Sequence, residues 1–369
     1  MINFESRLSS LKNRRQGTAE RHRIDEGYSY GIDYRPLESY ENLGESAAIK
    51  YVIGAMAPVS ERSTQISKEE GERVASTLID LLATSNINAE MRMQGSVALD
   101  IHIEGYSDVD MLILKSDIIT IQKPAVLGTN YIDSNDGRFM VDIIRELRIE
   151  SEIKLSSRYH AAKVDISGNK SIALSGGSLK RKVDIVPSSW YDTHDYQHSK
   201  LEYLRAVNIY DKGNHLLIEN KPFLHIKKVH ERDVHYNGNL KKVVRLMKNI
   251  VADMPDYKKN KAKKLSSYDI ASIAFAMDDK LACSQYFPLV LLENLRSYLL
   301  IVAYLDEPRG SMMVPDESRK VFNTDDKLEA VKIIYGEIND LAIAIQKVIS
   351  PLNENYDGTI LKNKHINFF

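Results

Sequence analysis

Hydrophobic positions change their spacing twice along this chain of 369 residues, and the changes predict three consecutive regions. Residues 1–86 are expected to be mainly helical. Within them, Glu69–Ala83 carries four apolar residues at 3- and 4-residue steps, which is the spacing of one face of a helix. Ser67, with Glu70 three residues later, has the pattern of a capping box and predicts where this helix begins.

Residues 87–190 have the pattern of strands. Four short apolar segments are expected to be strands: Val109–Leu114, Lys163–Ile166, Ile172–Leu174 and Lys182–Val186. The second and third flank a Ser-Gly-Asn-Lys turn, which indicates a hairpin. One helix, at about Arg138–Leu155, interrupts the strands, so an α/β or α+β sheet domain is expected.

The chain after residue 200 is expected to be helical. Apolar stripes mark Leu240–Val251, Tyr268–Met277 and Ala330–Ser350, the last of which is stopped by Pro351. The basic run Lys258–Lys264 between the first two helices is either a solvated loop or a patch that faces a nucleotide. The expected domains are 1–200, with the sheet and the N-terminal helices, and 201–369, with the later helices.

Composition and charge narrow the function. Fifty basic and 51 acidic residues give a net charge of −1, which argues against a sequence-independent duplex binder, because such proteins need a large cationic excess. The single cysteine, Cys283, excludes an intramolecular disulfide and a zinc site built from several Cys; we expect it to be a small buried residue. No apolar run approaches the ~18 residues of a membrane span, and the first residues lack the pattern of a signal peptide, so a cytoplasmic protein is expected.

The segment Gln94–Leu114 carries the candidate chemistry. Gly95-Ser96 follows a predicted strand and can present a small side chain and backbone N–H groups to a phosphate. Asp108 and Asp110 lie at the start of the next strand, on the same face, because side chains alternate along a strand. Such a pair can also occur by chance at an exposed strand edge. Two adjacent carboxylates suit Mg²⁺ bound to a nucleotide, since Mg²⁺ prefers one or two carboxylates plus phosphates and water.

A third carboxylate would complete a site for two metals. Asp165 and Asp184 both lie in Lys-Val-Asp-Ile segments. Asp165 precedes the Ser-Gly-Asn-Lys turn, where a polar side chain is easily solvated. Asp184 is flanked by apolar residues, with Pro187 expected to end the strand, and a carboxylate there is unfavourable unless it is paired or bound to metal. We therefore choose Asp184.

These motifs resemble a known superfamily. Gly-Ser, then Asp-x-Asp, then Val-Asp-Ile-Val-Pro is similar to the polymerase-β-like nucleotidyltransferases. In the C-terminal half, Val243–Lys248 and Lys264–Tyr268 resemble the second-lobe signature of cyclic GMP-AMP synthase, oligoadenylate synthase and their bacterial relatives, the CD-NTases. The resemblance covers about residues 50–280. It implies an α+β, two-lobed fold: a mixed-sheet nucleotidyltransferase lobe and a helical lobe similar to that of oligoadenylate synthase.

The resemblance also implies nucleotide-binding residues. Lys248 and Ser267 match positions that hold the triphosphate in the family, and Tyr268 matches the position that stacks on a base; Gln94, with Gly95 and Ser96, completes the set. The residue types suit these roles, because Lys is a point charge for phosphate and an aromatic face stacks on any base. The alternatives are an exposed helical Lys, a Ser that caps a helix and a Tyr in the core.

The implied reaction joins NTPs (ATP, and GTP or another NTP) into a cyclic or linear oligonucleotide second messenger in bacterial antiphage defence, read by a downstream effector. Two Mg²⁺ ions, or Mn²⁺, would be held by Asp108, Asp110 and Asp184. The chain departs from the family at Ile101, where a Thr is common. It also lacks the Cys set of the animal DNA sensor's zinc thumb, which argues against activation by duplex DNA. Its last residues, 366–369, do not resemble a C-terminus that ligase-like partners conjugate.

Two other functions stay open from the sequence. The same lobe could extend an RNA 3′ end or tag a tRNA, although the near-neutral charge argues mildly against a tRNA substrate. The chain could also be a nucleotide-binding regulator without turnover. The presence of all three carboxylates favours an enzyme over the regulator.

Overall fold

The computed structural model of this protein describes residues 2–25 and 37–368. The chain divides into two compact units. The sheet unit comprises Ser60–Asp100 and Ser107–Lys228, and the helical unit comprises Met1–Val59, Ile101–Tyr106 and Val229–Phe369. The domains expected at 1–200 and 201–369 follow from the hydrophobic pattern along the chain, and that boundary stays a prediction.

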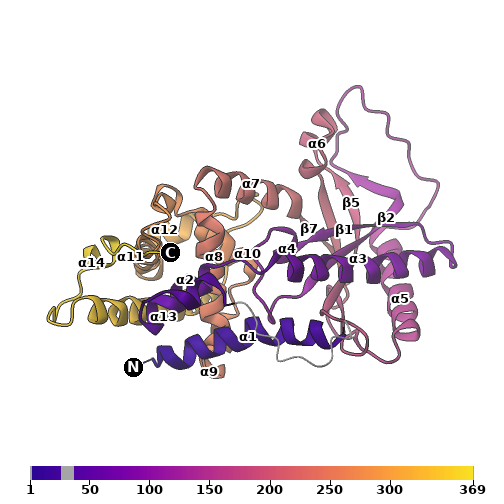
Figure 1. Ribbon diagram of the computed structural model, residues 1–369. Coiled ribbons are helices and arrows are strands. Elements are labelled where there is room, and N and C mark those ends of the chain that lie inside the picture. Colours follow the sequence, from indigo (N-terminus) through magenta and orange to yellow (C-terminus); the bar gives the residue numbers. More distant parts are fainter. Residues whose placement is uncertain (1, 26–36, 369) are drawn as a thin grey trace. The chain divides into compact units, whose positions relative to one another are not determined.

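One mixed sheet of seven strands forms the sheet unit (Figure 1). Its strands are β1 (Ala89–Gln94), β2 (Val109–Ile121), β3 (Lys163–Asp165), β4 (Ile172–Ser175), β5 (Val183–Asp192), β6 (Ala206–Asp211) and β7 (Leu216–Asn220). The central strands β2 and β5 are parallel, and every other pairing is antiparallel: β1 with β2, β4 and β6 with β5, β3 with β4, and β7 with β6. The expected hairpin is therefore confirmed as β3–β4. The expectation that the chain is helical after residue 200 is wrong for β6 and β7, which extend the sheet by pairing with β5 and with each other.

The prediction that Pro187 ends its strand is wrong, because β5 continues to Asp192. Strand β4 pairs with β5 only as far as Ile185, and β6 pairs with it only from Ser188. Pro187 thus lies where β5 changes its antiparallel neighbour, so the N–H that proline lacks is not needed by either strand. The residues of β5 after Pro187 include Trp190, which is 1% exposed and lies in the core.

Several helices belong to the same unit as the sheet. The sheet unit contains α3 (Glu61–Ala83), α4 (Gly95–Ala98), α5 (Met140–Arg158), α6 (His194–Ser199), the 3₁₀ turn η2 (Glu202–Leu204) and the start of α7 (Pro222–His235). Helix α3 begins earlier than Ser67, because the Ser60 hydroxyl accepts a hydrogen bond from Ser63 N (3.2 Å) and caps it there. Ser67 lies inside the helix, and its hydroxyl donates to Ser63 O (3.0 Å).

Side chains on β2 alternate between two hydrophobic clusters. Val109, Met111 and Ile113 pack in the cluster that contains the apolar residues of α3 and α5. Leu112 and Leu114 belong to a second cluster, with Trp190. Asp110 falls between Val109 and Met111, so it lies on the face away from α3 and α5. The sheet therefore directs its central carboxylates to the face that these helices leave open.

Helices α2 (Ala47–Met56) and α8 (Asn239–Asp253) lie at the centre of the helical unit, where α8 contacts α1, α2, α9, α10, α11 and α13. The other elements are α1 (Phe4–Asp25), η1 (Ser39–Asn42), α9 (Asp256–Ala262), α10 (Ser267–Phe275), η3 (Asp278–Leu281), α11 (Leu289–Tyr304), α12 (Asp306–Ser311), α13 (Asp325–Ile349) and α14 (Gly358–Lys362). In the part of the chain that the structure describes, no helix is long and apolar enough to cross a membrane.

The basic run Lys258–Lys264 is largely helical, not a loop. Most of it lies in α9, and three of its lysines pair with acidic residues of α13. Lys258 Nζ lies 2.7 Å from Glu337 Oε1, Lys261 Nζ lies 2.7 Å from Glu329 Oε1, and Lys264 Nζ lies 3.5 Å from Asp326 Oδ2. Glu337 is buried, and Arg7 of α1 also pairs with it at 2.6 Å. These three lysines therefore form ion pairs with α13.

Candidate active site

A row of polar side chains crosses the sheet at the beginning of β2 and β5. In the strand register, Gln94 lies opposite Asp110, Asp110 opposite Asp184, Asp184 opposite Ala173, and Ala173 opposite Asp165. Residues that are opposite each other in a sheet point to the same face. The register thus places Asp110 and Asp184 side by side on neighbouring strands.

Gly95 allows the chain to pass close to this row. Its φ is +75°, in the left-handed region that favours glycine. A Cβ atom at this position would overlap Asp110 Oδ2. The backbone after β1 can therefore approach the Asp110 carboxylate only with glycine here, and Ser96 follows it as a buried residue at the start of α4.

The Lys182 ammonium lies between the carboxylates of Asp108 and Asp184. Its Nζ lies 2.5 Å from Asp108 Oδ2 and 3.5 Å from Asp184 Oδ1. Although burial alone would lower it, the pKa of Lys182 is raised, because Asp108 and Asp184 favour the charged ammonium. A cation already sits between two of the three predicted ligands.

The Asp184 side chain is more buried than that of Asp108. Its side chain is 18% exposed, compared with 34% for Asp108. Burial is the main reason that the pKa of Asp184 is raised; Lys182 lowers it and Asp108 raises it further. Oδ1 of Asp184 is buried and accepts no hydrogen bond.

The side chains of this group are of the kind that binds a hard divalent cation. Three carboxylates come from the start of two adjacent strands, one carboxylate oxygen is buried without a hydrogen bond, and a lysine ammonium lies where positive charge is needed. In the arrangement seen, with Lys182 between Asp108 and Asp184, no three His, Cys, Asp or Glu side chains among the described residues are grouped tightly enough to hold a metal ion.

The alternative third ligand, Asp165, has a different environment. Its Oδ1 accepts hydrogen bonds from Ser167 N (2.9 Å) and Ser167 Oγ (2.6 Å), and these bonds lower the pKa of Asp165. In the register it is two strands from Asp184, about 10 Å away at ~4.8 Å per strand. Its carboxylate is therefore already satisfied within its own turn.

Three of the six residues expected to bind the nucleotide, Lys248, Ser267 and Tyr268, lie in the helical unit. Lys248 on α8 is only 4% exposed, which excludes the alternative that it is an exposed helical Lys. The apolar spacing predicted one buried face, but α8 packs against other helices on several sides, and polar Arg245 and Asn249 are buried with Lys248. Tyr268 is half-buried, with the Arg319 guanidinium 5.6 Å from its ring centre.

Ser267 is the first residue of α10, and the cap is its neighbour Ser266. The Ser266 hydroxyl accepts from Asp269 N (3.2 Å), and Asp269 Oδ2 accepts from Ser266 N (3.1 Å), so the two form a capping box. Asp269 also pairs with Arg319 (2.8 Å). The Ser267 hydroxyl is therefore not the helix cap, which was the alternative to phosphate binding.

Lys182 was not among the site residues predicted from the sequence. The signal was present: Lys182 precedes Asp184 by two residues, as Asp108 precedes Asp110, so the same alternation places it on the carboxylate face. Its contact with Asp108 depends on the parallel pairing of β2 with β5, where Val109 N donates to Lys182 O (3.0 Å). The sequence does not show which strands pair.

Comparison with known proteins identifies the family. Residues 227–338 match the family described as the cGAS/DncV-like nucleotidyltransferase C-terminal helical domain. The cyclic dinucleotide synthase CdnE of Yersinia aleksiciae is 38% identical to this chain over 363 residues, which cover 94% of this chain and 93% of that protein. A c-di-GMP synthase of Capnocytophaga granulosa is 30% identical over 82% of this chain and 88% of that protein.

The fold agrees with these matches. The solved structure of a STING-associated CdnE c-di-GMP synthase from Capnocytophaga granulosa superposes with a TM-score of 0.68 at 26% identity and covers 94% of this chain and 100% of that chain. The chain therefore belongs to the CD-NTase family of nucleotidyltransferases. The predicted α+β polymerase-β-like fold and the enzyme class are both confirmed.

Proposed function

We propose that this protein joins two nucleoside triphosphates into a cyclic dinucleotide with Asp108, Asp110 and Asp184 as its catalytic residues. In each of two steps, a ribose hydroxyl attacks the α-phosphorus of the other nucleotide, a P–O bond forms, and the bond to the pyrophosphate leaving group breaks. The observation that carries this assignment is the register of β2 with β5, which pairs Asp110 with Asp184 beside Gly95. The family of the chain supports the reaction.

The carboxylates are the groups that would hold divalent metal. Asp108 and Asp110 would bind both of two Mg²⁺ ions, with Mn²⁺ as a substitute, and Asp184 would bind one of them. When bound, these ions neutralise charge on the α-phosphate and the pyrophosphate. Lys182 would then have to leave the position between Asp108 and Asp184.

Asp184 also suits the proton transfer. The attacking hydroxyl must lose its proton, and a carboxylate with a raised pKa is a better acceptor than an ordinary one. The buried Oδ1 accepts no hydrogen bond, and it could take the proton directly or through water once Lys182 has left its position 3.5 Å away. Asp184 thus combines the roles of ligand and base.

For the nucleotides, we propose Gln94, Gly95 and Ser96 in the sheet unit and Lys248, Ser267 and Tyr268 in the helical unit. Lys248 and Ser267 would contact the triphosphate, and the Tyr268 ring would stack on a base. The substrates are ATP, GTP or another NTP in the cytoplasm. The product would act as a second messenger for a downstream effector in antiphage defence.

The test compares the purified protein with Asp110→Asn and Asp184→Asn in an assay of pyrophosphate release from mixed NTPs and Mg²⁺. Each variant should lose at least about a hundredfold in rate, a barrier increase of ~2.7 kcal/mol. Their circular dichroism spectra should match that of the wild type, because each change removes one charge from a partly repulsive group. Either variant with more than a tenth of the wild-type rate would overturn the assignment.

A further inference from the structure

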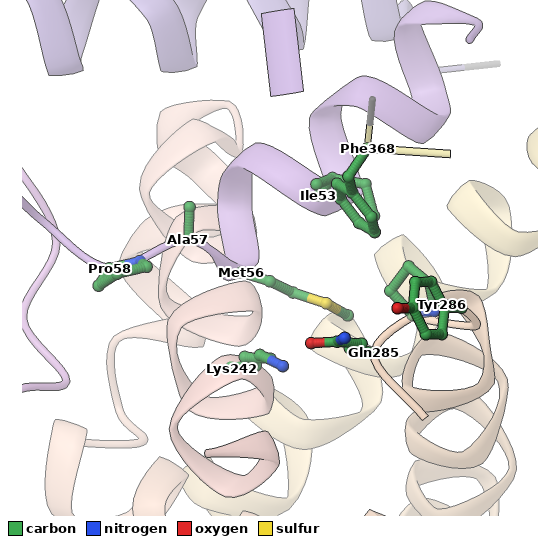
Figure 2. A pocket seen from close by; sticks show the side chains of 9 residues that line it. Ile53, Met56, Ala57, Pro58, Lys242, Gln285, Tyr286 and Phe368 are labelled. Atoms are coloured by element: carbon green, nitrogen blue, oxygen red, sulfur yellow. The ribbon is translucent and has the colours of Figure 1, made fainter. Parts of the chain in front are cut away.

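A cavity in the helical unit is lined by none of the residues assigned to the reaction. Its volume is about 370 Å³, within the ~300–1,000 Å³ typical of small-molecule sites. Its walls come from the end of α2 and the residues after it, from α8, from the loop before α11 and from the C-terminal residues (Figure 2). The lining residues are Ile53, Met56, Ala57, Pro58, Lys242, Gln285, Tyr286, Pro288 and Phe368.

The apolar side of the cavity is held in place by hydrogen bonds to the end of α2. Arg245 Nε donates to Met56 O (2.9 Å), and Asn249 Nδ2 donates to Ala55 O (2.8 Å). Arg15 Nη2 donates to Pro58 O (2.8 Å). Because the last carbonyls of a helix lack partners within the helix, these bonds fix a wall that would otherwise fray.

The opposite side is fixed by the C-terminal residues. The Tyr286 ring stacks on His365, with ring centres 5.7 Å apart and planes 12° from parallel. Ile366 N donates to Tyr286 O (3.0 Å), and Ile366 is fully buried. Tyr286 and Phe368 nevertheless stay 40% and 37% exposed. The cavity thus has a buried floor and a partly exposed aromatic rim through which a ligand can enter.

Lys242 is the only charged residue of this lining. Its ammonium donates to Asn239 Oδ1 (3.0 Å), and among the described residues no carboxylate lies within ion-pairing distance of it. Asn239 is itself oriented by the bonds that its amide donates to Leu281 O (3.0 Å) and Cys283 O (3.2 Å). Figure 2 shows Lys242 and Gln285 on opposite walls, with their polar ends toward each other.

The electrostatics of Lys242 point to an anionic ligand. Burial is the main reason that the pKa of Lys242 is lowered; Cys283 and Asp233 oppose the shift and Arg245 adds to it. A half-buried ammonium without a carboxylate is stabilised by an anion that enters beside it. One cation in an apolar cavity suits one negative charge; a triphosphate would bring several charges with a single lysine to offset them.

We infer that this cavity binds a small, mostly apolar molecule with one negative charge, and that Lys242 recognises the charge. The apolar part of the ligand would lie against Ile53, Met56 and Pro288. The acid group would reach Lys242, with Gln285 as a second polar contact. This inference does not depend on the proposed catalytic residues.

The experiment measures binding of decanoate to the full chain by isothermal titration calorimetry. Decanol and decylammonium serve as matched probes with the same chain and no charge or the opposite charge. Decanoate should bind with one site per chain and more tightly than either of the other two. Lys242→Met should weaken decanoate at least about tenfold and leave decanol unchanged, because only the charged contact is removed.

Two further variants complete the test. Lys347→Met removes an exposed lysine of α13 and should bind decanoate as the wild type does. Ala57→Phe reduces the free volume and should weaken decanoate and decanol together. The inference is overturned if decanoate does not bind, if Lys242→Met binds it as tightly as the wild type and Lys347→Met, or if decylammonium binds equally well.

Discussion

At the scale of single residues, the environment of each aspartate determines its expected role. Asp184 has a desolvated carboxylate with one oxygen that accepts no hydrogen bond, whereas both contacts of Asp165 Oδ1 are supplied by Ser167. The two lie in the same Lys-Val-Asp-Ile context and on the same row of the sheet. They are therefore a matched pair for substitution.

Asp184→Asn should lose at least about a hundredfold in the rate of pyrophosphate release, while Asp165→Asn should stay within about threefold of the wild type. The reason is that only Asp184 is next to Asp110 in the strand register. Initial rates at saturating NTP check this. An inactive Asp165→Asn beside an active Asp184→Asn would move the third ligand to β3.

Lys182 competes with metal for two of the carboxylates. Lys182→Met should therefore lower the concentration of Mg²⁺ needed for half-maximal activity, and Mn²⁺ measured by electron paramagnetic resonance should bind more tightly to the NTP-free variant. Lys180→Met, in which another exposed lysine close to the strand is removed, is the control and should leave both values unchanged. Weaker Mn²⁺ binding in Lys182→Met would show that the lysine supports the metal site instead of competing with it.

The raised pKa of Asp184 also has a consequence for stability. Because the folded state holds this proton more tightly than the unfolded chain, with its usual Asp pKa of 3.8, protonation of Asp184 favours folding. Its contribution is present below the unfolded pKa and is lost as pH rises through the folded pKa. Asp184→Asn, which mimics the protonated acid, should raise the melting temperature of the metal-free protein at pH 7.

The gain in melting temperature should shrink as the pH falls, because the wild-type carboxyl itself becomes protonated. Differential scanning fluorimetry between pH 4 and 7, with chelator present, measures this. A variant that melts below the wild type at pH 7 would mean that the attraction between Asp184 and Lys182 outweighs the cost of burying the carboxylate.

At the scale of elements, the two serines at the start of α10 are expected to have different roles. Ser266 caps the helix, and Ser267 is proposed to contact the nucleotide. Ser266→Ala removes the cap and should cost about 1 kcal/mol of folding stability, with little change in the KM for NTP. Ser267→Ala should raise the KM about tenfold, the value of one charge-assisted hydrogen bond, and leave the melting temperature unchanged. If instead Ser266→Ala alone changes the KM, the phosphate contact belongs to the cap.

Strand alternation was enough to predict that Asp108 and Asp110 share a face, because it depends only on local geometry. The flanking apolar residues were enough to favour Asp184. The hydrophobic pattern also located α5, α8, α10 and α13 within a few residues, and it placed the hairpin β3–β4. These features depend on the local spacing of apolar and polar residues, which can be seen in the sequence itself.

Other features depend on contacts between distant segments. The role of Lys182 requires the parallel pairing of β2 with β5, and the passage of β5 through Pro187 requires a change of neighbour at that residue. Lys248 is buried because α8 has helices on several sides, which a single apolar stripe does not predict. Most of the basic run is helical, as part of α9, and Glu337 and Glu329 of α13 pair with its lysines.

At the scale of the whole molecule, the chain combines a sheet unit that carries the carboxylates with a helical unit that carries Lys248, Ser267 and Tyr268. Its similarity to the Yersinia aleksiciae synthase extends over 94% of its length and thus includes residues of both units. The near-balanced charge of −1 argues against sequence-independent binding of duplex nucleic acid. The molecule is accordingly expected to act on free nucleotides.

The most direct test of the central claim is the identity of the product. The purified chain is incubated with Mg²⁺ and NTPs carrying labelled α-phosphate, singly and in pairs, and the product is treated with phosphatase and analysed by mass spectrometry. A cyclic dinucleotide has no terminal phosphate, so the account predicts a labelled product that resists phosphatase, forms without RNA and is lost in Asp110→Asn. Label that appears only at the 3′ end of added RNA would contradict it.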